Sequence, residues 1–355
     1  EEAFETGQLP ATMEEVLIVV LPKQGKDLLE VGSYRRLSML NMDYKILSKI
    51  LAMRLLPVVT SVVHPDQNGF IPRRSTFLNT RRSCHILDKM ADVMDLPVAL
   101  SLDIEKAFDT LTWDYLQAVL KHVGLGPNCL RRIKLLYRVP RARGQTGRQI
   151  SDGFDTQRGT RQGCPLSPLI FALAMEPLAC HCRVRGLEWG VMEGTDSHVV
   201  SLYADDAIIY LRDSQRALPE MFQLLDRFGT VGGLRVNWTK STLYPLHSLR
   251  EGEDLTPPAT RLLWSPVTFK YLGIYVYHSE RELIEGNLVR TVAAIKSSIT
   301  FWTKLPLSPM GRVAVAKMLV LPRLLYLFTA LPVMPPKAYF RGLSSLLADL
   351  VWGNG

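Results

Sequence analysis

The sequence predicts an α+β protein in which a mixed central region lies between two helix-rich regions. Three observations support this prediction. Apolar residues recur at helical spacing early and late in the chain. Short β-type apolar runs gather between residues 98 and 276. The composition, 47% hydrophobic and 21% charged over 355 residues, is that of globular proteins, which excludes collagen-like, coiled-coil and wholly disordered chains.

The first hundred residues predict one strand and one long helix. Residues 14–21 (EEVLIVVL) form an apolar run typical of a strand, and Pro22 ends it. From Asn41 to Val63 apolar residues recur at helical spacing, until His64-Pro65-Asp66 ends the helix.

The central region predicts alternating short strands and helices. Residues 98–102 (VALSL) form a short buried strand, and Thr112 is a candidate N-cap for a helix over 113–123. A helix over 128–137 leads into the basic stretch 138–148, which is typical of a solvated hairpin or loop. The later predicted elements are helices over 165–185 and 217–229, strands over 199–202, 207–211 and 269–276, a short strand at Val236, and a wholly helical region from about 281.

Acidic residues stand beside two of these apolar strands. Asp103 follows the strand 98–102, and Asp205-Asp206 lie between 199–202 and 207–211, where a tight hairpin turns. Aspartate is common in hairpin turns, so turn chemistry alone explains Asp205-Asp206. If the two places meet at one sheet edge, however, three carboxylates repel each other and need a partner. Two Mg²⁺ ions would supply it, in the arrangement used for nucleotidyl transfer.

Several blocks extend this hypothesis, because they resemble the motifs of reverse transcriptases of LINE-type (non-LTR) retrotransposons. The blocks are residues 33–41 (SYRRLSMLN), 66–72 (DQNGFIP), 101–109 (SLDIEKAFD), 159–168 (GTRQGCPLSP), 203–206 (YADD), 233–237 (GLRVN) with Lys240, and 270–274 (KYLGI). They occur in the family's order and spacing. The resemblance implies a right-hand polymerase fold with fingers (1–97), an antiparallel-sheet palm (98–282, with a fingers-side insertion at about 111–150) and a helical thumb (283–355).

The resemblance also implies roles for individual residues. Asp103, Asp205 and Asp206 would be the catalytic, metal-binding carboxylates for Mg²⁺, for which Mn²⁺ can substitute. Phe108 would be the steric gate that excludes a 2′-hydroxyl, although a phenylalanine there also fits a core position. The other implied contacts are Ala107 and Gln162 at the incoming nucleotide, Arg74 (or Arg73) at its triphosphate, and Lys240 as the acid for pyrophosphate, where a solvated lysine fits equally well.

Two residues depart from the family's pattern. Arg36 stands where the family commonly has proline, and Arg73 where it commonly has glycine. Both lie in the predicted fingers and add positive charge. The three carboxylates are unaffected, so we predict an active enzyme.

A net charge of +8 favours a polyanionic partner. We expect a template–primer groove that includes Arg35, Arg54, Arg141 and Arg143, although any one of them also fits a solvated surface position. The five cysteines are scattered and predict a reduced, intracellular setting. The apolar stretch 313–334 is broken by Lys317 and Arg323, so we expect a buried helix there and no membrane span.

The predicted function is RNA-directed DNA synthesis from a primer 3′-OH, with an RNA template, a DNA primer and deoxynucleotides as partners. The alternatives are a non-catalytic, domesticated nucleic-acid-binding scaffold and an RNA-dependent RNA polymerase. The family's habit implies action in the nucleus. Because the chain starts without methionine, we expect it to be part of a longer protein.

Overall fold

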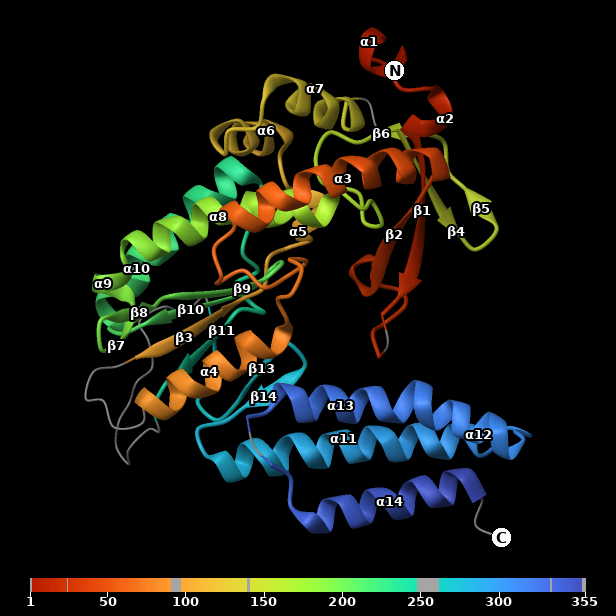
Figure 1. Cartoon of the computed structure of the whole chain (residues 1–355), viewed down its shortest axis with the longest axis vertical. Coiled ribbons are helices and arrows are strands. Elements are labelled where there is room, and N and C mark those ends of the chain that lie inside the picture. Colours follow the sequence, from red (N-terminus) through yellow and green to blue (C-terminus); the bar gives the residue numbers. More distant parts are fainter. Residues whose placement is uncertain are drawn as a thin grey trace.

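The computed structural model describes residues 2–23, 25–90, 97–138, 141–247, 262–332 and 334–352. Three parts follow one another along the long axis: a sheet with helices, a second sheet with helices, and a group of helices (Figure 1). The described ends of the chain lie at opposite ends of the molecule (Figure 1). The predicted α+β class is confirmed.

The first sheet has the strand order β2-β1-β4-β5, with β6 also paired to β4. The predicted strand 14–21 is β1 (Glu15–Pro22), which follows the short helices α1 (Glu2–Thr6) and α2 (Ala11–Glu14). The other elements are η1 (Val31–Ser33), β2 (Tyr34–Leu40), β4 (Arg141–Thr146), β5 (Gln149–Ile150) and β6 (Phe154–Asp155). The basic stretch 138–148 therefore contains a hairpin, as one of our two expectations had it. Its first strand also pairs in parallel with β1, which is far away in sequence.

Helices connect this sheet to the next. The long helix predicted after Asn41 is α3 (Met42–Val62), and the Asn41 side chain accepts a hydrogen bond from the Asp43 amide. Next come α6 (Trp113–His122), α7 (Pro127–Leu136) and α8 (Ser167–Val184), all near their predicted positions. Thr112 does occupy the N-cap position of α6. The predicted N-cap is therefore confirmed, although the Thr112 hydroxyl makes no capping bond and instead donates to the Val231 carbonyl at 3.0 Å.

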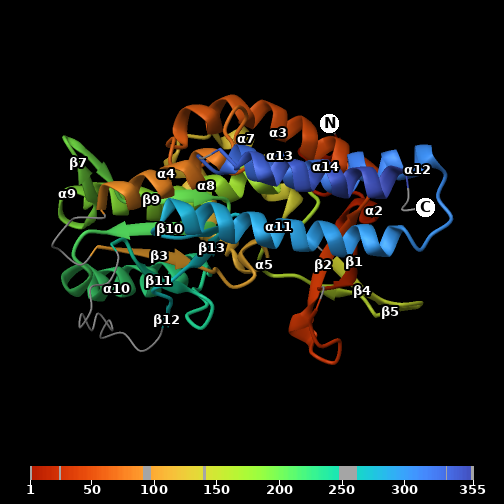
Figure 2. The same ribbon diagram turned by 90° about the horizontal axis from the view of Figure 1, so that it is seen from below.

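The second sheet, here called the central sheet, has the strand order β12-β11-β3-β10-β9. Its strands are β3 (Val98–Leu102), β9 (Val200–Tyr203), β10 (Asp206–Leu211), β11 (Thr242–Pro245) and β12 (Leu263–Trp264). Helices α8 and α10 (Ser214–Gly232) cover one face, and α4 (Thr76–Met90) lies on the other (Figures 1 and 2). Side chains alternate accordingly: Leu100 and Ile209 join the α8–α10 core, whereas Ala99 and Ile208 join the α4 core.

Smaller elements complete this part: α5 (Ala107–Thr110), α9 (Gly186–Trp189), β7 (Val191–Glu193) and β8 (Asp196–His198). The prediction of one strand over 269–276 was wrong. Leu272 and Gly273 both have positive φ and form a tight turn that divides it into β13 (Phe269–Tyr271) and β14 (Ile274–Val276). Val236 forms only an isolated bridge to Ile104.

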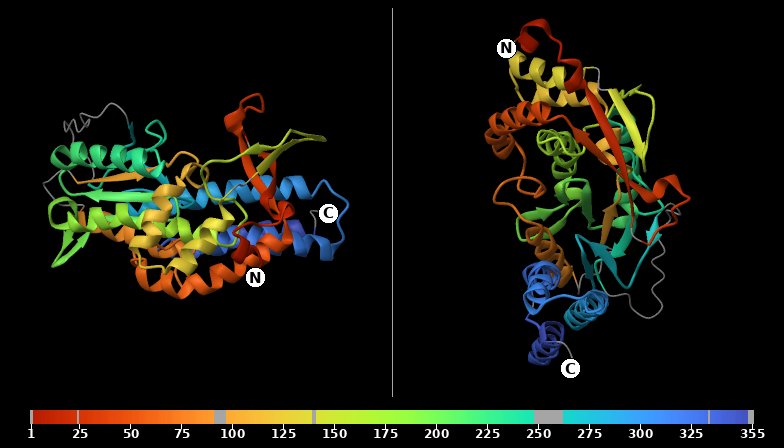
Figure 3. Two further views of the ribbon diagram at one scale, coloured as in Figure 1. Left: turned by 90° about the horizontal axis from the view of Figure 1, so that it is seen from above. Right: turned by 90° about the vertical axis from the view of Figure 1, so that its right-hand side faces the viewer.

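The C-terminal part is helical, as predicted. Its elements are α11 (Glu280–Trp302), α12 (Pro309–Val315), η2 (Ala316–Val320), α13 (Leu321–Ala330) and α14 (Lys337–Trp352), seen together in both views of Figure 3. Helix α11 starts at Glu280 because Ser279 caps it by accepting from the Glu282 amide. The predicted 282/283 boundary therefore falls inside its first turn.

The continuous segment from Pro309 to Ala330 is long and apolar enough to cross a membrane by length and composition alone. That is weak evidence, because core helices of soluble proteins share these properties. Val320 and Leu324 from the segment pack with Ile295 of α11 and Leu343 of α14, but only 28% of its most apolar window is buried, so the prediction of a buried helix was wrong for most of the segment.

Candidate active site

The three predicted carboxylates meet at one end of the central sheet. Strand β10 pairs antiparallel with β3, with Ala207 opposite Leu102, so continuing the register by one residue places Asp103 opposite Asp206. Strand β9 pairs with β10 on the other side, and Tyr203 opposite Asp206 closes the hairpin. Residue 103 therefore shares one sheet end with residues 205 and 206, which lie more than a hundred positions later in the sequence.

The hairpin turn has an unusual backbone. Only Ala204 and Asp205 separate the paired residues Tyr203 and Asp206, and Ala204 has φ of +57°. A two-residue hairpin loop needs positive φ, which normally favours glycine or asparagine. For alanine this conformation costs about 1 to 2 kcal/mol. Such strain persists only where the surroundings enforce it, and it gathers at functional sites.

Burial and mutual repulsion raise the pKa values of the carboxylates. The pKa of Asp206 is raised to about 6, mainly by burial and further by the charges of Asp205 and Asp103. The pKa of Asp205 is raised by burial and, to a smaller extent, by Asp103. Burial also raises the pKa of Asp103, whereas the Lys240 ammonium lowers it. The structure thus brings the predicted Lys240 close to the carboxylates, on an exposed loop after Asn237.

Phe108 lies in α5, five residues after Asp103. Its ring stacks on Phe171 of α8, with centroids 4.4 Å apart, and meets the ring of Phe70 edge-on at 6.3 Å. The motif at 159–168 packs directly on its backbone. The Thr160 hydroxyl donates to the Phe108 carbonyl at 3.2 Å, and a Cβ at Gly159 would lie 2.6 Å from the Asp109 carbonyl oxygen. Glycine at 159 therefore allows the loop that carries Gln162 to approach Phe108.

Strand β2 of the first sheet closes over this region. The Ser38 amide donates to the Gln162 carbonyl at 3.3 Å, and a Cβ at Gly163 would lie 3.1 Å from the Ser38 carbonyl oxygen. Arg36, the residue that departs from the family's pattern, forms an ion pair with Asp109 at 3.0 Å. Two partners here were not predicted from the sequence: Asp109, which pairs with Arg36, and Lys23, whose charge lowers the pKa of Asp103.

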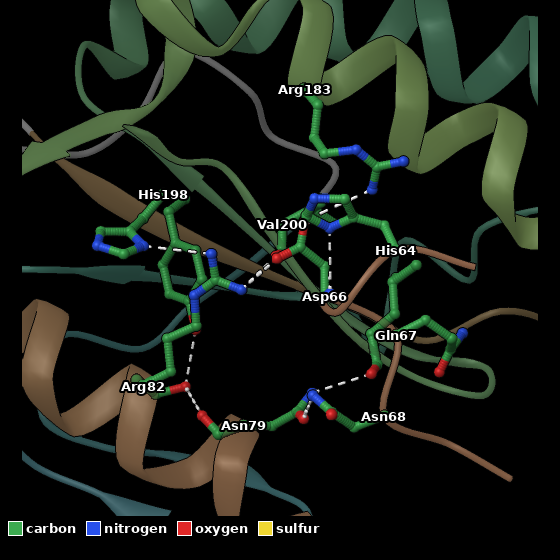
Figure 4. A network of polar contacts seen from close by, with 12 residues as sticks. His64, Asp66, Gln67, Asn68, Asn79, Arg82, Arg183, His198 and Val200 are labelled. Atoms are coloured by element: carbon green, nitrogen blue, oxygen red, sulfur yellow. Dashed lines mark hydrogen bonds and ion pairs between the residues drawn. The ribbon is translucent and has the colours of Figure 1, made fainter. Parts of the chain in front are cut away.

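The residues just after α3 attach to strand β9 through a buried polar network (Figure 4). Asp66 is 5% exposed and forms ion pairs with Arg82 of α4, with Arg183 of α8 at 3.4 Å, and with His64 at 2.9 Å. Two residues later, the Asn68 side chain donates a hydrogen bond to the Asn79 side chain of α4. Side chains from two helices, α4 and α8, therefore hold this segment beside β9. The motif 66–72 was assigned to the fingers from the sequence, but no role was predicted for these residues.

Arg74 and Ala107, both predicted to contact the incoming nucleotide, make contacts within the protein itself. The Arg74 guanidinium donates to the carbonyls of His64 (2.6 Å), Gln67 (2.7 Å) and Val63 (2.9 Å), so it binds the chain at the end of α3. Its assignment to the triphosphate stays a prediction, and those donors are engaged as the side chain lies. Arg73 is exposed, with φ of +66°. Ala107 is 3% exposed and belongs to the core.

The four arginines predicted to bind nucleic acid are all exposed, but they do not form one group. Arg35 lies on β2, Arg54 on α3, and Arg141 and Arg143 on β4. Two of them have acidic partners: Arg143 pairs with Glu15 at 2.5 Å and Arg141 with Asp155 at 3.8 Å. Their role stays a prediction.

The carboxylates of Asp103, Asp205 and Asp206 suit a divalent cation, because carboxylate oxygens are the ligands that such cations prefer. The pKa of each of the three is raised, and a bound cation would stabilise their charged forms. As the side chains lie, no three His, Cys, Asp or Glu residues in the described ranges are arranged to hold a metal ion. The fit therefore rests on the chemistry of the three donors and on their charge coupling.

Comparison with known proteins agrees with this geometry. A sequence model of the family "Reverse transcriptase (RNA-dependent DNA polymerase)" matches residues 21–276, more than half of the chain. The chain is 32% identical to the transposon TX1 uncharacterized 149 kDa protein of Xenopus laevis, over 99% of this chain and 26% of that protein. It is 24% identical to a Pol polyprotein from the type-1 retrotransposable element R2 of Popillia japonica, over 90% of this chain and 45% of that protein.

A solved structure resembles the fold at much lower sequence identity. The telomerase of Candida tropicalis in complex with a TWJ fragment of telomeric RNA gives a TM-score of 0.56 at 11% identity, covering 98% of this chain and 56% of that one. At this identity the likeness concerns the fold alone, and it supports the predicted right-hand polymerase. The chain spans between about a quarter and a half of the length of the two retrotransposon relatives.

Proposed function

The chain belongs to the reverse transcriptase family, with relatives in non-LTR retrotransposons, and we propose that it is the catalytic core of an RNA-directed DNA polymerase. The observation that carries this proposal is the convergence of Asp103, Asp205 and Asp206 at one sheet end. A scaffold that only binds nucleic acid has no need to hold three mutually repelling carboxylates together.

In the proposed reaction, deoxynucleotides are added to a primer 3′-OH opposite an RNA template. Asp103, Asp205 and Asp206 would hold the divalent ions that the family generally uses. When bound, Mg²⁺ would activate the primer hydroxyl and stabilise the leaving pyrophosphate. Lys240 lies near these carboxylates and would place a proton donor beside the pyrophosphate. Mn²⁺ would bind to the same carboxylate oxygens.

Phe108 would act by exclusion. Its ring is fixed between Phe171 and Phe70, so it does not move aside easily. A 2′-hydroxyl against a fixed ring costs free energy, and a deoxyribose avoids that cost. This preference distinguishes the proposal from an RNA-dependent RNA polymerase, which needs room for the hydroxyl. Action in the nucleus, the expected location, stays a prediction.

Primer extension on poly(rA)/oligo(dT) tests the proposal. We expect Mg²⁺-dependent incorporation of dTTP but not UTP, and its loss in Asp205→Asn, which keeps the side-chain size and removes the charge. The matched control is Asp226→Asn, an exposed aspartate on α10. Tight binding of template–primer without extension would favour the scaffold, and equal use of UTP would favour the RNA polymerase.

A further inference from the structure

Gln67 makes contacts that no sequence motif explains. Its side chain is completely buried in the segment after α3. Its Oε1 accepts hydrogen bonds from two amides, Gly69 N–H at 2.8 Å and Ala204 N–H at 2.9 Å. Its Nε2 donates to the Ala204 carbonyl at 3.4 Å. The Gln67 side chain therefore forms hydrogen bonds with both the amide and the carbonyl of Ala204, in the turn of the β9–β10 hairpin.

Ala204 needs such a partner for two reasons. It is 3% exposed, and it lies beyond the last β9–β10 pair, so the ladder does not satisfy its amide and carbonyl. A buried polar backbone group without a partner costs about 1 to 3 kcal/mol. Ala204 also has the strained positive φ. Gln67 satisfies the buried amide and carbonyl of Ala204, and these bonds also restrain the backbone in its positive-φ conformation.

Gln67 itself is held firmly. The residues on either side of it pair with Leu202 of β9: the Asn68 amide donates to the Leu202 carbonyl, and the Leu202 amide donates to the Asp66 carbonyl, each at 2.8 Å. Asp66 is anchored by Arg82 and Arg183, as Figure 4 shows. The amide group of Gln67 therefore projects from a fixed frame onto the turn.

We propose that Gln67 is a positioning residue that fixes the turn 204–205, and with it the carboxylates of Asp205 and Asp206. What those carboxylates do rests on the proposed function, whereas the hold on the turn does not. Glutamine suits this place because the turn offers one donor and one acceptor, and an amide side chain carries both an acceptor oxygen and a donor nitrogen. A glutamate would lose the bond to the Ala204 carbonyl and add negative charge beside three carboxylates.

Hydrogen–deuterium exchange of the full chain measures the hold directly, without metal or substrate. In Gln67→Leu we expect exchange at the Ala204 amide to become roughly fivefold to thirtyfold faster, as loss of about 1 to 2 kcal/mol of hydrogen bonding requires. Gln67→Glu keeps the acceptor for that amide, so its increase should be smaller. The matched control is Thr80→Val in α4, which also removes a fully buried polar group, but one that donates to the Ala330 carbonyl of α13 and not to the hairpin.

Binding of Mn²⁺, measured by calorimetry, gives a second readout. We expect the affinity to fall by roughly 10-fold to 100-fold in Gln67→Leu, as for residues that orient metal ligands, and to stay unchanged in Thr80→Val. In primer extension Gln67→Leu should lower kcat while the KM for template–primer stays constant.

The outcomes separate the two proposals. Unchanged exchange at Ala204 in both Gln67 variants overturns the positioning role. Faster exchange in a protein that never extends a primer supports the positioning role and refutes the proposed function. If Gln67→Leu does not fold, Gln67→Glu carries the test, because it retains one of the two bonds to the hairpin.

Discussion

Substituting alanine for Gly69 tests whether the hairpin must lie where the structure has it. Gly69 follows the Gln67-Asn68 segment, and an added Cβ would lie 2.3 Å from the Ala204 nitrogen and 2.9 Å from the Tyr203 carbonyl carbon. Ordinary contacts of a Cβ begin at 3.4 Å, so the two segments must separate by about 1.1 Å. Both neighbouring atoms belong to the backbone, so no side-chain rotation relieves the clash.

The expected consequence is a large loss of activity with a moderate loss of stability. Overpacking of this kind costs about 1 to 3 kcal/mol of unfolding free energy. A displacement of about 1 Å at the reacting groups lowers the rate by roughly 100-fold. The carboxylates of Asp205 and Asp206 adjoin Ala204, so they move with it. We therefore expect Gly69→Ala to fold and to lose about two orders of magnitude in kcat.

Primer extension and urea unfolding of the same preparations measure the two effects. The control is Gly342→Ala in α14, where an added Cβ meets nothing within 4 Å. Alanine there should raise the unfolding free energy by about 1 kcal/mol, because glycine is a poor helix residue, and should leave kcat unchanged. Full activity in a folded Gly69→Ala would refute the reasoning, since it would mean that the hairpin has room to move or does not carry the active carboxylates.

Three further predictions concern other contacts. Phe108→Ala should raise the ratio of UTP to dTTP incorporation, because the ring fixed against Phe171 is removed; an unchanged ratio in steady-state kinetics would show that it is not the gate. Asp66→Asn should lower the unfolding free energy by about 3 kcal/mol in urea titration, because Arg82 and Arg183 lose their shared carboxylate, and a loss below 1 kcal/mol would contradict a structural role for the network. Burial raises the pKa of the half-buried Cys84 to about 11, so iodoacetamide at pH 8 should label the exposed Cys180 well before Cys84. Because the folded protein favours the neutral Cys84 thiol, its contribution to stability is present below pH 9 and is lost as the pH rises towards 11; equal labelling of both cysteines at pH 8 would contradict a raised pKa at Cys84.

Local sequence predicted most of the elements, because their signals are local. The apolar run at 14–21, the helical spacing after Asn41 and the two apolar runs around 203–206 became β1, α3 and the β9–β10 hairpin. The failure over 269–276 was local as well, because the strand breaks where Leu272 and Gly273 adopt positive φ. Thr112 stands at the N-cap of α6 as predicted, although its hydroxyl bonds to a carbonyl on α10 and does not cap the helix.

The sequence by itself determined which residues are the candidates for the chemistry, because aspartates beside apolar strands and motifs in a fixed order are visible along the chain. Only the tertiary structure decided how those residues are held. Gln67 and Ala204 are 137 positions apart, and β4 joins β1 across more than a hundred residues. A hydrogen bond or a strand pairing of that kind leaves no periodic pattern, since it depends on where two distant backbones meet after folding.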